Sequence, residues 1–241
     1  MKRHALLIAN ADAAGAQNDI TNWMKFLRSD VGGAWYESEI QVLTNPSKTY
    51  LDVVLYWTKE GHYDFVIVVY AGHGGWERTT ILEINPNGET VNENDLKGLA
   101  SREILSLDCC RSIITVTNSL NEAKLTMFSE TTRSGIRARY DTRMMQAIPQ
   151  QITLYACSVG ECAYCTNEGG YYTRNLLRQS ADVTYSGFRT INQAHNAAAL
   201  ETIKEVREKE NQGQRPDISM VRCLTEQQLI IGIDTSMFHR Y

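Results

Sequence analysis

The chain has 241 residues and a formal net charge of −4, and its 43% hydrophobic and 9% aromatic content is typical of a folded globular protein. This charge gives no reason to expect a nucleic acid or a membrane as a partner, because both favour a basic face. No apolar run approaches the roughly 18 residues of a membrane span, and the six cysteines, two of them adjacent, do not suit a disulfide scaffold. We therefore expect a reducing, cytoplasmic location.

Strands and helices alternate through the first half of the chain. Apolar and β-branched runs predict strands at Ala5–Ala9, Glu39–Leu43, Asp64–Tyr70 and Glu103–Leu107. Helices are predicted to begin at Asn18 or Asp19 and at Ser47, which are residue types that cap helix N-termini. The runs Thr79–Ile84 and Glu89–Val91 flank turn residues and indicate a hairpin.

The second half begins with a polar stretch, about residues 115–150, which we expect to be a long exposed loop with at most one helix. Strands are then predicted at Ile152–Ala156, Val183–Gly187, Ile218–Cys223 and Gln228–Ile233, and helices at Tyr171–Gln179 and Gln193–Glu210. This alternation predicts an α/β fold with a mostly parallel central sheet and helices on both faces. No linker divides the chain, so residues 1–241 are predicted to form one domain.

Two reactive side chains follow successive core strands. His73 lies in the glycine-rich turn Ala71–Gly75, and Cys110 comes directly after the next apolar strand. Because active sites of open α/β sheets lie outside the carboxyl ends of the strands, we expect the two to meet there. A thiol with a neighbouring imidazole is suited to nucleophilic catalysis. The amides of Gly74 and Cys110 are candidates for an oxyanion hole.

Several segments resemble a known family. Tyr70–Gly74 (Tyr-Ala-Gly-His-Gly) is similar to the histidine block of metacaspases and bacterial caspase-like peptidases, and Leu107–Ser112 to their Asp-Cys-Cys block. Ala156–Glu161, Gly169–Thr173 and Gln214–Asp217 resemble later segments of the same family. The resemblance implies a caspase-like fold and a cysteine endopeptidase that needs no cofactor.

The resemblance also implies roles for single residues. The second cysteine of the family block is the nucleophile, which makes Cys110 the candidate and Cys109 its rival. In metacaspases two aspartates line the pocket for the residue before the cut and select Arg or Lys; their counterparts here are Asp19 and Asp108. For each aspartate, the alternative is a structural role, as a helix cap or as an acceptor that orders a loop.

The family further implies maturation by self-cleavage in the loop after the nucleophile. That stretch of this chain offers four candidate cleavage residues, Arg133, Arg137, Arg139 and Arg143. Members of this size often act in cell death or defence, with a protein or peptide substrate and an activating partner protein. Calcium dependence is not expected, since Thr79–Glu93 holds only Glu83, Glu89 and Glu93 as carboxylates.

Two other functions remain open. Cys157, Cys162 and Cys165, with Cys223 as a fourth ligand, have a spacing that could hold an iron–sulfur cluster or zinc, although we expect no metal. The chain could also be a catalytically silent binding module. The presence of both His73 and Cys110 argues against this second reading, because silent relatives of enzymes commonly lack one such residue.

Overall fold

The computed structural model describes residues 1–113, 133–183 and 187–236. Its central sheet has six strands in the order β12-β8-β7-β3-β1-β2. The strands are β1 (Arg3–Ala9), β2 (Ile40–Thr44), β3 (Phe65–Ala71), β7 (Arg102–Asp108), β8 (Gln150–Tyr155) and β12 (Asp217–Ser219). All neighbours pair in parallel except the edge strand β12, which is antiparallel to β8. This confirms the predicted, mostly parallel sheet.

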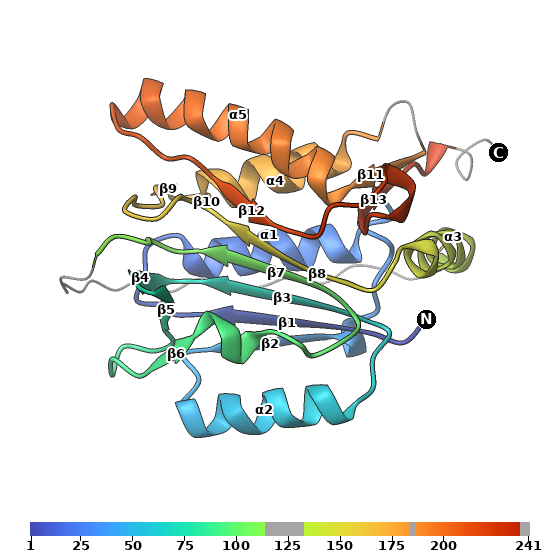
Figure 1. The fold of residues 1–241 in the computed structure, drawn as a ribbon, viewed down its shortest axis with the longest axis horizontal. Helices are drawn as coiled ribbons and strands as arrows, with labels where there is room; N and C mark the ends of the chain where they lie inside the picture. The colour runs from blue at the N-terminus through green and yellow to red at the C-terminus, as the bar shows by residue number, and fades with distance from the viewer. Residues whose placement is uncertain (114–132, 184–186, 237–241) are drawn as a thin grey trace.

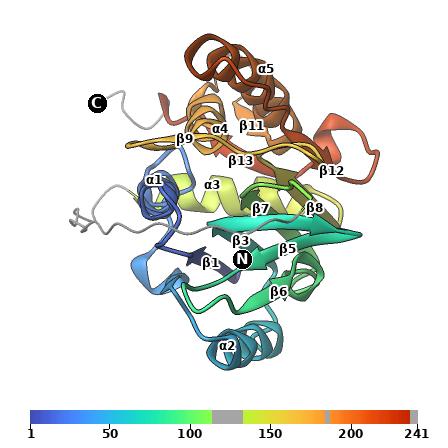
Figure 2. The same ribbon diagram turned by 90° about the vertical axis from the view of Figure 1, so that its left-hand side faces the viewer.

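Helices cover both faces of this sheet, as Figures 1 and 2 show. One face carries α1 (Ala16–Arg28), α3 (Arg133–Gln146), α4 (Tyr171–Ala181) and α5 (Ile191–Glu210). The other face is covered by α2 (Lys48–Glu60), which begins after its predicted cap, Ser47. None of the helices in the described part of the chain has the length and apolar content that a membrane crossing needs.

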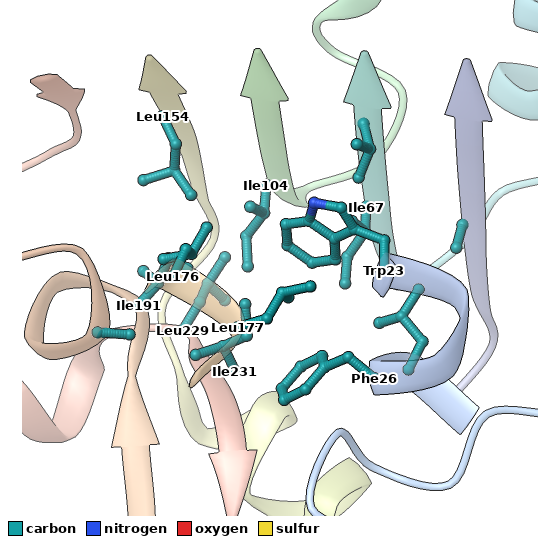
Figure 3. Close-up of a cluster of buried hydrophobic side chains, with 14 of the residues drawn as sticks. Trp23, Phe26, Ile67, Ile104, Leu154, Leu176, Leu177, Ile191, Leu229 and Ile231 are labelled. Atoms are coloured by element: carbon teal, nitrogen blue, oxygen red, sulfur yellow. The ribbon is translucent and has the colours of Figure 1, made fainter. Parts of the chain in front are cut away.

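The strands read as continuous apolar runs because each one is buried on both sides. In β3, Phe65, Ile67 and Val69 belong to the core under α1 and α4, whereas Val66 and Val68 belong to the core over α2. Figure 3 shows the first core, where side chains of α1 and α4 pack on the sheet around Ile67 and Ile104. The hydrophobic effect thus fixes the sheet between two helical layers.

Smaller antiparallel sheets complete the fold. A three-stranded antiparallel sheet is formed by β4 (His73–Glu77), β5 (Thr79–Glu83) and β6 (Thr90–Asn92). Two short antiparallel pairs join β9 (Cys165–Thr166) to β10 (Gly169–Gly170), and β11 (Phe188–Thr190) to β13 (Ile230–Ile233). Figure 1 places β4, β9 and β10 at the edge of the central sheet toward which the parallel strands point.

The structure corrects several expected elements. The predicted turn Ala71–Gly75 is replaced after Ala71 by β4, which pairs with β5. The N-cap of α1 is Gly15, in the left-handed conformation with φ 79°, rather than Asn18 or Asp19. Residues 184–186 of the predicted strand Val183–Gly187 lie outside the described part of the chain, and β11 begins at Phe188.

The polar stretch 115–150 contains one helix, α3 at Arg133–Gln146, but one face of this helix is buried, whereas the whole stretch was expected to be exposed. Residues 114–132 lie outside the described part of the chain. Within α3, Ile136, Tyr140 and Met144 are fully buried. These three residues recur every fourth position and form one apolar stripe, but the many polar residues between them hide the helical period in the sequence.

Candidate active site

The register of the central sheet brings His73 and Cys110 together. Strands β3 and β7 pair so that Ala71 lies opposite Asp108, and the Gly72 N–H donates to the Asp108 carbonyl over 3.1 Å. His73 and Cys110 each follow this matched pair by two residues. Both line one cavity of about 210 Å³ at the carboxyl edge of the sheet.

Strand β4 holds the backbone of His73 beside the chain that follows the nucleophile. The Trp76 N–H donates to the Ser112 carbonyl over 3.1 Å. A β-carbon at Gly74 would lie 2.9 Å from the Cys110 carbonyl oxygen, so only glycine permits this approach. The Tyr70 hydroxyl lies 2.6 Å from the His73 carbonyl and donates to it. The two backbone segments whose N–H groups are predicted to bind the oxyanion, at Gly74 and Cys110, are therefore adjacent. That these N–H groups point toward the oxyanion stays a prediction.

The two adjacent cysteines differ in their surroundings. Cys109 is 2% exposed and packs in the core over α2, and burial holds the pKa of its thiol well above the usual value. Cys110 is half-buried, with its Sγ 3.9 Å from the Ala163 carbonyl oxygen. Burial, and then the neighbouring Cys162, raise the pKa of Cys110 to about 12. At neutral pH the Cys110 thiol therefore keeps its proton until a base removes it.

One acid at the site was not expected from the sequence. The Oδ2 atom of Asp12 lies 4.0 Å from His73 Nε2, and the Asp12 side chain is only 4% exposed. Nε2 is buried and has no hydrogen bond within the described residues. Asp12 follows β1, which neighbours β3 in the sheet. Its position just beyond a core strand was the signal in the sequence that could have identified it.

The two aspartates predicted to form the substrate pocket line the same cavity as His73 and Cys110. Asp19 accepts a hydrogen bond from the Gly170 N–H over 2.8 Å. Asp108 accepts one from the Thr173 hydroxyl over 2.6 Å. A side chain at Gly170 would collide with the Asp108 carboxylate, so this glycine gives the acid its space.

The buried acids interact with each other. Burial and the charge of Asp108 raise the pKa of Asp19 well above its usual value, against the smaller opposing effects of the Gly170 N–H and Arg174. Burial likewise raises the pKa of Asp108, while the hydrogen bonds from Thr173 lower it. The site therefore has two carboxyl groups whose ionisation a bound cation would favour.

The candidate self-cleavage residues lie on α3, at the opposite end of the sheet from β4 in Figure 1. Arg137 forms an ion pair with Glu39. Arg139 donates to the Asp234 carbonyl over 3.0 Å, and Arg143, 9% exposed, donates to the Thr225 carbonyl over 3.3 Å. Arg133 is the first residue of the helix. Cleavage after any of them stays a prediction, and it would require the helix to unwind.

The cysteines proposed as metal ligands do not converge. No group of three or more His, Cys, Asp or Glu side chains suited to a metal occurs among the described residues. The Cys157 thiol is buried and lies 3.4 Å from the Cys109 carbonyl oxygen, whereas Cys165 is exposed. Cys162 instead neighbours Cys110.

The structure thus places a thiol and an imidazole at the carboxyl edge of an α/β sheet, beside a cavity lined with acids, an arrangement suited to the chemistry of cysteine peptidases. The chain belongs to the caspase domain family, whose family model matches residues 2–226. Family membership makes it a relative of cysteine peptidases that shares their fold. No curated protein matches the sequence.

Solved structures agree with this assignment. Caspase-1 from Spodoptera frugiperda superposes with a TM-score of 0.62 at 14% identity, over 98% of this chain and 91% of that one. The protein GSU0716 from Geobacter sulfurreducens superposes with a TM-score of 0.58 at 13% identity, over 95% of this chain and 97% of that one. At such low identity the likeness shows the fold, which spans nearly the full length of each chain.

Proposed function

We propose that the protein is a cysteine endopeptidase in which Cys110 is the nucleophile and His73 the general acid and base. The observation that carries this proposal is the matched pair Ala71 and Asp108, which sets both side chains at one cavity. The rival nucleophile, Cys109, packs in the core and serves as structural support.

The reaction follows from these roles. His73 takes the proton of the Cys110 thiol, and the resulting thiolate attacks the carbonyl carbon of the peptide bond. The negative charge on the carbonyl oxygen is stabilised by the N–H groups of Gly74 and Cys110. The imidazolium then gives its proton to the leaving amine, and a water molecule hydrolyses the thioester to free the enzyme. Because burial raises the pKa of Cys110 to about 12, the thiol keeps its proton at neutral pH until His73 accepts it.

Asp12 acts as a positioning residue in this scheme. Its carboxylate lies 4.0 Å from His73 Nε2, close enough to stabilise the imidazolium and to hold the ring with Nδ1 toward the cavity. We expect Asp12→Asn to lower kcat with little change in KM, because the carboxylate holds the ring and does not contact the substrate. An unchanged kcat, or a rise in KM at constant kcat, would show that Asp12 has no such role.

The residue before the cut is proposed to be Arg or Lys. Asp19 and Asp108 line the cavity beside Cys110, and neither forms a close ion pair among the described residues. A guanidinium or ammonium group entering the cavity would pair with these carboxylates, whereas an acidic side chain would be repelled. We further propose that the substrate is a protein of a cell-death or defence pathway and that a partner protein activates the enzyme.

The test is hydrolysis of short fluorogenic peptides that differ only in the residue before the cut: Arg, Lys, Asp, Leu or Ala. Wild type, Cys110→Ala and the matched control Cys109→Ala are assayed together. Cleavage after Arg or Lys that is lost only in Cys110→Ala is the expected result. Loss in Cys109→Ala alone would reassign the nucleophile. No cleavage of any peptide or of a denatured protein would favour the silent binding module.

A further inference from the structure

Thiols gather around the nucleophile beyond what the proposed reaction uses. Cys157 contacts the Cys109 carbonyl, and Cys162 neighbours Cys110. The reaction needs only one of these four sulfurs. Cys157 and Cys162 were singled out in the sequence by their spacing, and the proposed reaction gives neither of them a role.

The backbone holds Cys162 beside the nucleophile. The Gly160 N–H donates to the Arg111 carbonyl over 2.9 Å, and the Arg111 N–H donates to the Glu161 carbonyl over 3.0 Å. On the other side of Cys162, the Ala163 carbonyl oxygen lies 3.9 Å from Cys110 Sγ. Both chain neighbours of Cys162 thus contact the segment of the nucleophile, and after burial Cys162 is the group that most raises the pKa of Cys110.

The other cysteines are less suited to pair with Cys110. Cys109 is adjacent in sequence, and Cα atoms joined by a trans peptide are about 3.8 Å apart, below the roughly 4.4–6.8 Å of disulfides. The Cys157 thiol lies 3.4 Å from the Cys109 carbonyl oxygen and 3.3 Å from the Glu161 carbonyl oxygen, and its single proton is donated to one of the two. Cys165 packs against Gly15, on the side of the cavity where Asp19 lies.

We propose that Cys110 and Cys162 form a reversible disulfide when the protein meets a peroxide. Both thiols are half-buried, and Cys110 faces the cavity through which a small oxidant can enter. Cys162 would act as the resolving cysteine, the thiol that completes the disulfide, and it lies in a loop that lines the site.

The chemistry balances in two steps. One thiol attacks the peroxide, whose O–O bond breaks; one oxygen stays on sulfur as a sulfenic acid and the other leaves as water or an alcohol. The second thiol then attacks the sulfenic sulfur, the S–S bond forms, and a second water leaves. Two thiols are oxidised and one peroxide is reduced. A dithiol reductant restores both thiols by exchange.

The consequence for the enzyme, which rests on the proposed function, is protection. A disulfide removes the nucleophile from use but can be reversed, whereas a thiol oxidised to the sulfinic acid is lost. Cys162 would therefore convert oxidative damage at Cys110 into temporary inactivation.

The test is to treat the full chain with hydrogen peroxide, block free thiols and measure its mass with peptide mapping by tandem fragmentation. Wild type is expected to take up the blocking reagent at four of its six cysteines, to lose about 2 Da as the two hydrogens of the other thiols, and to yield a peptide linked through Cys110 and Cys162. Cys162→Ser should lack this link and gain about 32 Da at Cys110 as the sulfinic acid. Cys165→Ser, three residues further along the chain in β9, is the matched control and should form the link as wild type does.

The outcomes separate this proposal from the proposed function, because the mass readout needs no peptidase activity. A wild type without the linked peptide, or a link through Cys157 or Cys165 instead, would overturn the disulfide. If peptides are cleaved, wild type treated with peroxide should regain its activity with dithiothreitol and Cys162→Ser should not. Equal recovery of both proteins would overturn the protective role.

Discussion

Neutralising one acid of the cavity should remove the preference for a basic residue before the cut. The change is Asp108→Asn, with Asp19→Asn as a second variant. Both carboxyl groups are buried, at 8% and 3% exposure, and asparagine keeps the acceptor oxygen that Thr173 or Gly170 contacts. The variants are therefore expected to fold.

The magnitude follows from the burial of the pair. Removing one member of a buried, hydrogen-bonded charge pair costs about 2–5 kcal/mol. Since about 1.4 kcal/mol is a factor of ten in rate, a loss of about 3 kcal/mol is roughly a hundredfold loss in kcat/KM. This loss applies only to substrates with Arg or Lys before the cut. Cleavage after Ala or Leu should change less than about threefold, because those side chains carry no charge.

The assay is kcat/KM for matched Arg and Ala peptides with wild type, both variants and Glu168→Gln. Glu168 forms an ion pair with Arg174, but its side chain is 79% exposed, so its charge is screened and the ratio should not change. A ratio of Arg to Ala cleavage that stays the same in both aspartate variants would refute the assignment of the pocket. Loss of all cleavage with an intact fold would instead place Asp108 in the reaction.

Three further predictions concern Glu103, Cys110 and Tyr70. Burial raises the pKa of Glu103 to about 7, so between pH 4.5 and 7 the folded state holds a proton that the unfolded state releases, and stability falls as pH rises through this range. The free energy of unfolding of Glu103→Gln, measured in urea, should therefore increase by about 3 kcal/mol relative to that of wild type between pH 4.5 and 8. A difference between the two proteins that stays constant over this range would contradict the prediction. Because the pKa of Cys110 is raised to about 12, the rate at which iodoacetamide alkylates it should rise about tenfold per pH unit between pH 7 and 9. The rate is followed by peptide mass in a Cys109→Ala background. A rate that does not change with pH would show a thiolate already paired with His73. Tyr70→Phe removes the hydroxyl that donates to the His73 carbonyl, and should lower the free energy of unfolding by about 1–3 kcal/mol and reduce kcat/KM. Full activity of this variant would show that β4 holds His73 without the Tyr70 hydrogen bond.

The candidate site was predictable where it depends on strand order. The strands before His73 and Cys110 were evident from apolar runs such as Phe65–Ala71, which are buried on both faces and so carry a strong signal. Parallel strands end at a common edge, and this rule was enough to expect the histidine and the cysteine together. The acids Asp19 and Asp108 came from the resemblance, and the structure places both at the same cavity.

The elements that the sequence misjudged depend on distant partners. β4 contains two glycines and would not form a strand alone; it is extended because β5 pairs with it and the Ser112 carbonyl accepts its Trp76 N–H. Helix α3 has a strongly polar composition, and its apolar stripe of three residues stabilises the helix only because the core of the protein packs against it. Backbone pairing and burial outweigh local preference at both places.

The sequence by itself determined the α/β architecture and the candidate pair His73 and Cys110, because periodic burial and strand ends are local patterns. Only the tertiary structure revealed Asp12 beside His73 and Cys162 beside Cys110. These contacts join segments far apart in the chain. Their closeness depends on strand register and on the backbone hydrogen bonds of the loop Gly160–Ala163, neither of which leaves a periodic signal in the sequence.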